Sequence, residues 1–357
     1  MTLLFVDSFD HYATTELTAK EKWDYYDTYS ENMEVAAVGR RGTNGVKVDG
    51  GNGTHDSVQI GVVIGDTQTL IMGAAFYFKK YIISTGTAHN NGFACFDSTG
   101  GGYQASMVVE ANGSVTIRRG SRTGTILAQS AAGVCKRYSW NYIEFKITID
   151  NAAGAGEVYV NGESVVSVAG VDTQSTANAF ANRIYLGLKC GDYSGNGVYA
   201  DDFYLCDDAG AVANDFLGDL RIDSLFADGA GNSTDWTPSA GNNYECVDEV
   251  TPNDDTDYVS ENSVADHDTY TYENTPVTAG SIFGIQHLLW ARKDDAPARS
   301  IVGMIRSGGT DYAPGATHAL TTSYIYYRDN YEVDPDTAAA WIIAGVNGAE
   351  FGERLEA

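Results

Sequence analysis

Proline, basic residues and long apolar runs are all scarce in this chain of 357 residues. None of the six prolines occurs before Pro238. The 22 Lys and Arg residues are outnumbered by 48 Asp and Glu residues, which gives a formal net charge of −26. This balance argues against a nucleic-acid partner, because neutralising phosphates requires Lys and Arg. It also argues against binding to anionic lipid.

No apolar run approaches the length of about 18 residues that a membrane-spanning helix needs. The first ten residues, MTLLFVDSFD, have no basic segment before the apolar ones, so we expect no secretory signal. The cysteines are odd in number and follow no metal-ligand spacing, which favours free, mostly buried thiols made in a reducing cytoplasm, with one disulfide as the alternative. They are Cys95, Cys135, Cys190, Cys206 and Cys246.

Composition divides the chain near residue 210. Residues 1–210 carry a net charge of −8 and residues 211–357 a net charge of −18, and every proline belongs to the second part. The stretch Cys206–Asp215, CDDAGAVAND, is small and polar, as linkers between domains commonly are. We therefore predict two domains, 1–210 and 216–357.

Both domains are predicted to be all-β. In Tyr142–Ile149, YIEFKITI, apolar side chains alternate with Glu, Lys and Thr, and this period of two indicates a strand with one buried face. Asn112-Gly113 and Asn161-Gly162 each separate two β-rich runs, and Asn-Gly suits the positive φ angles of a type I′ hairpin turn. Strands this short, with turns this frequent, predict two β-sandwich domains.

Further strands are predicted from runs of β-branched and aromatic residues. Glu16–Trp23 could form a turn or two of helix, and a second short helix is a candidate after Pro335. The strands are Thr69–Phe78, Gln104–Val109, Val115–Arg118, Glu157–Val160, Arg183–Leu188, Leu217–Leu225, Thr269–Tyr272, Ile282–Trp290, Ser300–Arg306 and Leu320–Arg328, and the second helix is Asp336–Trp341.

The motifs of the large enzyme classes are missing. The sequence contains no GxSxG nucleophile elbow, HExxH helix, phosphate-binding loop or CxxC pair. A jelly-roll glycan hydrolase needs two carboxylates that flank a cleft. No strand alternates acids onto one face in this way, and Glu144 stands alone on its strand. We therefore predict that the protein is not an enzyme.

Two acidic loops offer the oxygen donors that calcium prefers. Calcium takes about six to eight oxygen ligands, often from loops rich in Asp and Asn. Asp and Asn are equally the ordinary residues of turns, so turn formation is the alternative. The candidate ligands are Asp49 and Asp56 in one loop and Asp254, Asp255 and Asp257 in the other, and Asp201-Asp202 also gathers donors. No other cofactor is expected.

Two clusters of aromatic residues are the candidate contact residues. They are Trp23, Tyr25, Tyr26 and Tyr29 in WDYYDTY, and Tyr324, Tyr326 and Tyr327 in YIYY. A Tyr ring presents a flat apolar face and a polar edge, which suits a sugar or a protein interface. Packing across neighbouring strands is the other interpretation, and the sequence leaves all three open.

The first domain resembles the concanavalin A-like, laminin-G-like jelly roll. The resemblance is carried by Ser139–Ile147, in which Trp140 opens a long strand, and by Gly156–Glu163, which contains an Asn-Gly turn. Tyr199–Leu205, YADDFYL, resembles the closing strand of that family, which returns beside the N-terminal strand. The resemblance covers about residues 1–207 and implies a fold rather than a function.

The chain also resembles structural proteins of tailed bacteriophages. The matching segments include the opening DSFDHY at Asp7–Tyr12, FLGDLRI at Phe216–Ile222 and RSGGTDY at Arg306–Tyr312. The ending from Asp334 to Gly352 matches too, although such endings often have Gly where Ala338 or Ala339 stands. The resemblance implies a component of the virion, and it transfers no catalytic residues.

Three functions follow from these observations. The first is a non-enzymatic virion protein, in capsid decoration or in a tail or fibre, that binds other virion subunits and is exposed on the particle surface. Virion symmetry would make it a homo-oligomer. The alternative is a carbohydrate-binding module that recognises glycans of the host surface. A glycan hydrolase is the third, and the missing pair of carboxylates argues against it.

Overall fold

The computed structural model describes residues 3–13, 17, 22–28, 33–49, 57–79, 91–190 and 197–357. The chain forms two compact units: Trp23–Ile222, together with the N-terminal strand, forms the first, and Asp223–Ala357, together with Lys22, forms the second. All five cysteines lie in the described part, and each is a buried thiol that forms no disulfide there, as the sequence predicted. No helix among the described residues is long and apolar enough to cross a membrane.

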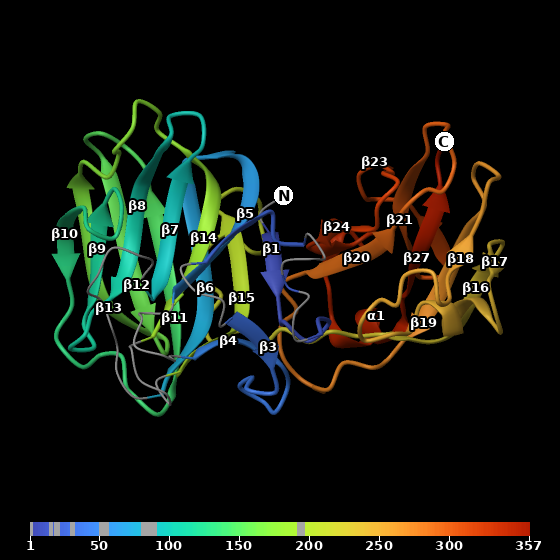
Figure 1. Ribbon diagram of the computed structural model, residues 1–357, viewed down its shortest axis with the longest axis horizontal. Helices are drawn as coiled ribbons and strands as arrows, with labels where there is room; N and C mark the ends of the chain where they lie inside the picture. The colour runs from blue at the N-terminus through green and yellow to red at the C-terminus, as the bar shows by residue number, and fades with distance from the viewer. Residues whose placement is uncertain are drawn as a thin grey trace. The chain divides into compact units, whose positions relative to one another are not determined.

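The first unit contains two antiparallel sheets that stack face to face (Figure 1). In the described residues, the eight-stranded sheet has the order β13 (Glu163–Val171), β12 (Gly154–Val160), β11 (Trp140–Thr148), β6 (Thr69–Phe78), β15 (Gly197–Asp207), β4 (Gly45–Asp49) and β3 (Met33–Ala36), with β1 (Leu3–Asp7) also on β15. The seven-stranded sheet has the order β10 (Thr125–Gln129), β9 (Val115–Arg119), β8 (Gly102–Val109), β7 (Gly92–Asp97), β14 (Ala181–Lys189), β5 (Ser57–Thr67) and β2 (Tyr25–Thr28).

This architecture confirms the predicted all-β fold with an N-terminal jelly roll. The closing strand β15 pairs with the N-terminal strand β1, from Leu3 opposite Cys206 to Asp7 opposite Phe203. Asn161 and Gly162 join β12 to β13 with φ angles of 53° and 82°, as the predicted type I′ turn requires.

Aromatic side chains from both sheets meet in the core of the first unit. Phe76 on β6 lies 5.6 Å from Phe93 on β7 between ring centroids, and Phe93 lies 6.1 Å from Phe203 on β15. Along β11 the inward residues are buried because the strand alternates as its sequence predicts. Burying one such ring contributes roughly 1.5–3 kcal/mol.

Strand β15 carries a bulge at two adjacent acids, Asp201 and Asp202, and both are almost fully buried. Asp202 has a left-handed backbone with φ of 51°. Its carboxylate receives the guanidinium groups of Arg40 and Arg41 and the backbone N–H of Ile222. The carboxylate of Asp201 accepts the backbone N–H of Arg40 at 2.7 Å. The bulge therefore fixes two segments that are distant in sequence.

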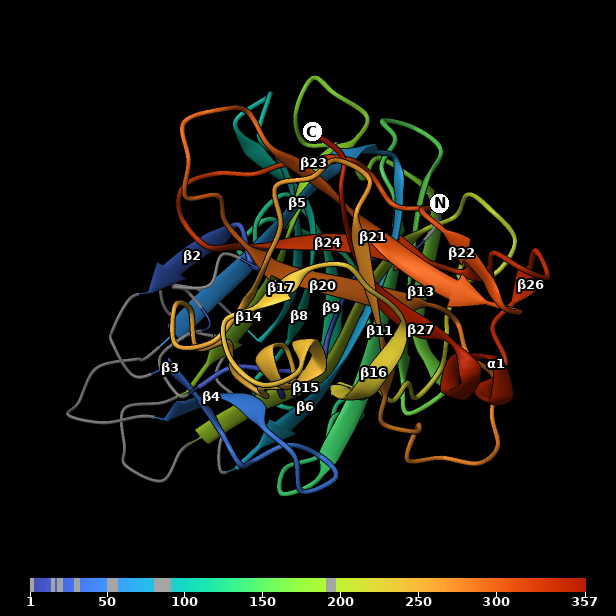
Figure 2. The ribbon, with the colours of Figure 1, turned by 90° about the vertical axis from the view of Figure 1, so that its right-hand side faces the viewer.

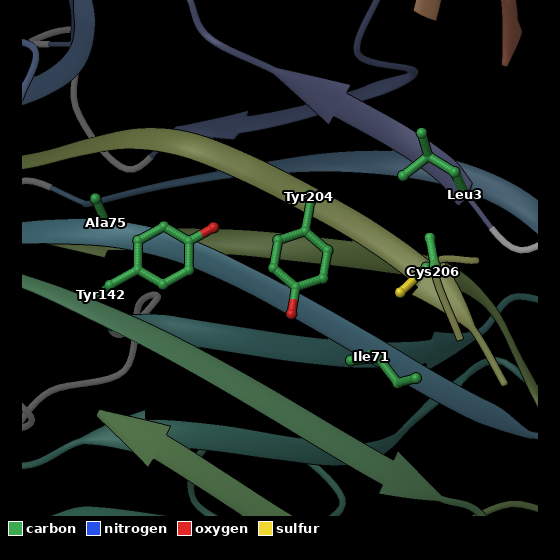
Figure 3. Close-up of a cluster of buried hydrophobic side chains, with 7 residues drawn as sticks. Leu3, Ile71, Ala75, Tyr142, Tyr204 and Cys206 are labelled. Atoms are coloured by element: carbon green, nitrogen blue, oxygen red, sulfur yellow. The ribbon is translucent and has the colours of Figure 1, made fainter. Parts of the chain in front are cut away.

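Residues 213–222, the covering segment, lie on the outer side of the eight-stranded sheet. Ala213 belongs to a buried cluster that includes Tyr142 and Tyr204 (Figure 3). Phe216, Leu217 and Leu220 pack against this cluster. Glu144 on β11 is buried and accepts hydrogen bonds from the Tyr204 hydroxyl at 2.6 Å and from the backbone N–H of Gly218 at 2.9 Å. Burial raises the pKa of Glu144 above its ordinary value.

The covering segment explains two differences from the sequence predictions. Leu217–Leu225 forms no strand, because backbone N–H groups of Leu217, Gly218 and Ile222 donate to side chains of the sheet instead of to a neighbouring strand. For the same reason the unit boundary lies after Ile222, whereas composition placed the linker at Cys206–Asp215.

The second unit is built on a six-stranded antiparallel sheet, counted over described residues: β16 (Ala227–Thr234), β19 (His267–Tyr272), β27 (Glu350–Leu355), β21 (Ser300–Ser307) and β22 (Thr310–Tyr312), with β23 (His318–Ala319) also on β21. A two-stranded ribbon, β20 (Ile285–Ala291) and β24 (Ile325–Tyr331), crosses this sheet (Figure 2). The small elements are β17 (Thr237–Pro238), β18 (Val259–Ser260), β25 (Val333–Asp334), β26 (Ala339–Ala340), a 3-10 helix (Asn243–Cys246) and α1 (Ile343–Gly348).

Two acids lie opposite each other in the buried face of the six-stranded sheet. Asp268 on β19 is paired in register with Glu353 on β27. The Tyr270 hydroxyl lies 2.7 Å from Oε1 of Glu353 and 3.1 Å from Oδ2 of Asp268. Burial, with a smaller contribution from the charge of Asp268, raises the pKa of Glu353 to about 8.

The predicted helix Asp336–Trp341 is wrong, because α1 begins at Ile343. Residues 334–338 form a turn in which the Asp334 carboxylate accepts the backbone N–H of Asp336 and the Asp334 carbonyl accepts that of Ala338. Ala338 is exposed and has a left-handed φ of 53°. A left-handed backbone costs an L-residue roughly 1–2 kcal/mol, and glycine avoids this cost.

We expect Ala338→Gly to raise the free energy of unfolding of the second unit by up to about 1 kcal/mol, because it removes the strain at φ of 53°. Chemical denaturation measures the change. Ala339→Gly is the matched control, since Ala339 is exposed in β26 without a positive φ and glycine weakens a strand. An equal gain from both substitutions would contradict the strain.

Stability of the second unit is expected to fall as the pH rises. Glu353 is protonated in the folded state up to a pKa of about 8, but it ionises near 4.3 in the unfolded chain. Its contribution is therefore fully present below about pH 4 and lost as the pH rises toward 8. Urea denaturation at pH 5 and pH 8.5 should show the loss, and Glu353→Gln should reduce the difference. An unchanged difference in the variant would refute the role of Glu353.

Candidate functional site

Trp23, the first predicted contact residue, is a core residue. It is 4% exposed, and its ring lies 4.8 Å from Phe5 and 5.2 Å from Phe203 between centroids. Its Nε1–H donates to Oδ2 of Asp7 at 2.7 Å, so the polar edge of the ring is also used inside the unit. The prediction of a surface contact at Trp23 is therefore wrong. Tyr29 lies outside the described residues.

The second cluster packs along the β20–β24 ribbon. Tyr324 stacks on Trp290 with ring centroids 5.8 Å apart, and Tyr326 lies 4.8 Å from the same ring. Tyr326 and Tyr327 are each 8% exposed. The Tyr327 hydroxyl donates to the carbonyl of Ala319 and accepts the backbone N–H of Thr321. These contacts support the interpretation as cross-strand packing for Tyr326 and Tyr327.

The acidic loop next to this ribbon is tied to its aromatic side chains. Oδ1 of Asp254 accepts Nε1–H of Trp290 at 2.9 Å. Asp255 pairs with Arg292 at 2.9 Å and accepts the Tyr324 hydroxyl at 3.0 Å. These hydrogen bonds lower the pKa of Asp255 below its usual value. Two of the predicted calcium ligands thus anchor a loop to the ribbon.

The other predicted calcium ligands that the structure describes, Asp257 and Asp49, have different partners. Asp257 accepts the side-chain amide of Asn253, and Asp49 forms an ion pair with Lys47 at 2.7 Å. Asp56 lies outside the described residues. Within the ranges that the structure describes, no group of three or more His, Cys, Asp or Glu side chains is placed to hold a metal ion.

The outer side of the seven-stranded sheet carries an aromatic cluster that includes only one predicted residue. This aromatic face consists of Tyr25 on β2, Phe96 on β7, Tyr103 on β8 and Tyr185 on β14. Its ring centroids lie 5.2 Å apart for Tyr25 and Tyr185, 5.9 Å for Phe96 and Tyr185, and 5.0 Å for Phe96 and Tyr103. Three of the rings are half-buried, while Tyr185 is 3% exposed. The face is therefore a continuous, partly accessible aromatic surface.

Strand register explains how these four rings meet. Tyr25 and Tyr185 both lie opposite Gly61 of β5, one on each neighbouring strand. A Cβ at Gly61 would lie 2.7 Å from ring carbons of Tyr185, so the glycine leaves the room that the ring fills. Tyr26 follows Tyr25 in an extended strand and therefore points to the opposite side of the sheet. Of the predicted aromatic residues, only Tyr25 belongs to the aromatic face.

Arg183 lies among these rings. Its guanidinium carbon is 4.9 Å from the ring centroid of Tyr25, 5.7 Å from that of Phe96 and 6.0 Å from that of Tyr185. Cation–π contacts of this kind contribute roughly 0.5–2 kcal/mol each. Nη1 donates to the Tyr185 hydroxyl oxygen at 3.1 Å. Burial raises the pKa of Tyr185, an effect that this hydrogen bond opposes.

One donor of Arg183 has no acceptor. Its Nε–H is shielded from water and forms no hydrogen bond. A buried donor without an acceptor costs about 1–3 kcal/mol, so such atoms in folded proteins call for an explanation. Beside this group the amide of Gln59 donates to the Tyr103 hydroxyl oxygen at 3.1 Å. The face thus combines flat apolar rings with a guanidinium, an amide and hydroxyl groups.

Sequence reasoning missed Phe96, Tyr103, Arg183 and Tyr185. Arg183–Leu188 was predicted as a strand, and period two would have placed Arg183 and Tyr185 on one side of it. The partners on β5, β7 and β8 come from pairings across the sheet that no local pattern encodes. The sequence therefore offered one pair of residues, whereas the site depends on the register of five neighbouring strands, β8, β7, β14, β5 and β2.

No family model matches the chain, and no curated protein matches it in sequence. Solved structures share its arrangement of strands distantly. The alginate lyase Aly36B is 14% identical, with a TM-score of 0.41, over 56% of this chain and 95% of that one. The cellulose-induced protein Cip1 is 18% identical, with a TM-score of 0.40, over 57% and 96%. The exoplasmic/lumenal domain of VIP36, in a Ca²⁺/Man3GlcNAc-bound form, is 10% identical, with a TM-score of 0.36, over 58% and 90%. No function follows from likeness at this level.

We expect Gly61→Ala to destabilise the first unit by about 1–3 kcal/mol, because the new methyl group would overlap the Tyr185 ring. Gly65→Ala, in the same strand, is the matched control, since a Cβ at Gly65 meets nothing within 4 Å. Denaturation curves of both variants measure the difference. Equal stability of the two variants would show that the ring of Tyr185 can move aside freely.

Proposed function

We propose that the first unit binds carbohydrate through the aromatic face, without catalysing a reaction. The proposal rests on one observation, which is the half-exposed group of rings around Arg183 on the outer side of the seven-stranded sheet. A pyranose ring has an apolar face that packs on flat aromatic side chains. Its hydroxyl groups need donors and acceptors close by, and Gln59, Tyr103 and Arg183 provide them.

Both outer sides of the jelly roll carry half-exposed rings. The covering segment buries Tyr142 and Tyr204 on the eight-stranded sheet, and Tyr77, Trp140 and Tyr199 stay half-exposed on the same side. On the seven-stranded sheet, Tyr25 and Phe96 are half-exposed around the guanidinium of Arg183. The aromatic face is favoured as the binding surface because its rings surround this guanidinium.

Binding without turnover is supported by the chemistry of the groups in this face. The polar contacts that the structure gives to its rings are those of Arg183 and Gln59, and neither side chain exchanges a proton near neutral pH. General acid–base catalysis works best with a group whose pKa lies near the operating pH. The expected absence of enzymatic activity thus stays a prediction, and this face agrees with it.

The assignment to a virion also stays a prediction. It rests on the sequence resemblance to structural proteins of tailed bacteriophages, and no comparison tests it. The same is true of the predicted binding to capsid or tail subunits, of a homo-oligomer and of location on the particle. A glycan-binding face is compatible with the predicted host adhesion, because recognition of host surface glycans requires a protein that binds sugar and stays exposed.

A glycan array with the complete chain tests the proposal, followed by titration calorimetry with the best oligosaccharide. We expect Tyr25→Ala and Tyr103→Ala each to weaken binding at least about tenfold, because each removes a ring from the face. Tyr138→Ala is the control, since Tyr138 is 62% exposed and lies outside the face. Absence of binding to any glycan, or equal weakening by all three substitutions, would refute the proposal.

A further inference from the structure

Arg183 has no carboxylate partner in a protein that is rich in carboxylates. Eight other arginines pair with an Asp or Glu side chain within 4.0 Å: Arg40, Arg41, Arg118, Arg119, Arg292, Arg299, Arg306 and Arg354. Arg183 forms no such pair with any residue that the structure describes. With 48 acids against 22 basic residues, a guanidinium left without an acid partner beside an accessible surface needs a reason.

The free donors of Arg183 lie along one edge of the guanidinium. Nη1 donates a hydrogen bond to the hydroxyl oxygen of Tyr185. Nε has no acceptor, and Nη2 forms no hydrogen bond with the described residues either. In a guanidinium, Nε–H and one N–H of Nη2 point in parallel and match the two oxygens of a carboxylate. Nε is shielded from water in this structure, so Nη2 is the donor on this edge that a ligand carboxylate can reach.

The surrounding rings hold this edge in place. Tyr25, Phe96 and Tyr185 all lie within 6.0 Å of the guanidinium carbon. Contact with the face of a ring stabilises the positive charge but accepts no hydrogen bond from Nε. Because the ring contacts restrict the side chain before a ligand arrives, less conformational entropy is lost on binding.

The distribution of charge favours an acidic ligand beside Arg183 over most other parts of the surface. The net charge of −26 repels an anion from most of the surface. The guanidinium of Arg122 lies close enough to Tyr103 to interact with it electrostatically, which places a second positive group near this ring. A neutral sugar would use the rings and the amide of Gln59, but it would leave the guanidinium without a counter-charge.

We infer that the aromatic face binds an acidic glycan, with a sugar carboxylate, such as that of a uronic acid, on Nη2 of Arg183 and the pyranose ring on the neighbouring aromatic rings. The inference rests on the proposed carbohydrate binding and adds the class of sugar. It assigns to Arg183 the role of the residue that selects acidic over neutral glycans.

The test compares uronate-containing oligosaccharides with the same oligosaccharides after reduction of the carboxyl groups, by titration calorimetry with the complete chain. We expect the reduced sugars to bind at least about tenfold more weakly. Arg183→Ala should remove this difference. Arg183→Lys should restore only part of it, because an ammonium keeps the charge but lacks the planar group that lies among the rings.

Arg119→Ala is the matched control. It removes the same charge from β9, but Arg119 pairs with Asp172 and points away from the face. Circular dichroism and thermal melting verify that each variant is folded, and Arg183→Lys keeps the test valid where Arg183→Ala is unstable. A sulfated neutral oligosaccharide separates carboxylate recognition from general attraction of anions.

The outcomes distinguish failure of the acidic class of sugar from failure of carbohydrate binding as a whole. Equal binding of the acidic and the reduced sugars, or a difference that survives in Arg183→Ala, would overturn the acidic class and leave carbohydrate binding intact. Equal binding of the sulfated sugar would overturn recognition of the carboxylate. Absence of binding to every sugar would overturn the proposed function itself.

Discussion

The jelly roll depends on two buried acids that sit side by side in a bulge of its closing strand. Burial raises the pKa of Asp201 and of Asp202 above the ordinary value, and the charge of Asp202 adds to the effect on Asp201, so the fold must supply partners for them. It does so from distant parts of the chain, with the backbone of Arg40, the guanidinium of Arg41 and the backbone of Ile222. Breaking a buried charge pair costs several kcal/mol, on the order of 3–5. The bulge thus links the closing strand, the covering segment and the loop before β4.

Much of the fold could be predicted from sequence because its signals are local. Alternation in Tyr142–Ile149 gave a strand that the structure has as Trp140–Thr148, and the Asn-Gly pair at Asn161 gave a hairpin turn. The predicted strand Leu217–Leu225 does not form, and the reason is physical. Its apolar residues do bury one side, but the acceptors for its N–H groups are Glu144, Asp202 and the Tyr204 hydroxyl. A pattern of apolar residues reports burial and does not report which group accepts a hydrogen bond.

The candidate site was harder to predict because it is made of pairings across a sheet. Trp23 and Tyr25 are two residues apart in one aromatic run, yet one ring lies in the core beside Asp7 and the other on the outer aromatic face. Arg183 lies in a strand whose partners begin at Ser57 and Gly92. Composition indicated Tyr as the contact residue and gave no indication of Arg. An arginine without an acid partner can be recognised only from a structure that shows the side chains around it.

The covering segment closes part of one outer side of the jelly roll. A bare sandwich has two outer sheet sides, and either can evolve into a contact surface. Here Phe216 and Leu217 cover the cluster around Tyr142 and Tyr204, so substitutions beneath this segment change stability before they change recognition. Variation in the aromatic face has fewer such constraints, since Tyr25, Phe96 and Tyr103 are half-exposed. Specificity can therefore diverge at the aromatic face while the covered part of the other sheet preserves the fold.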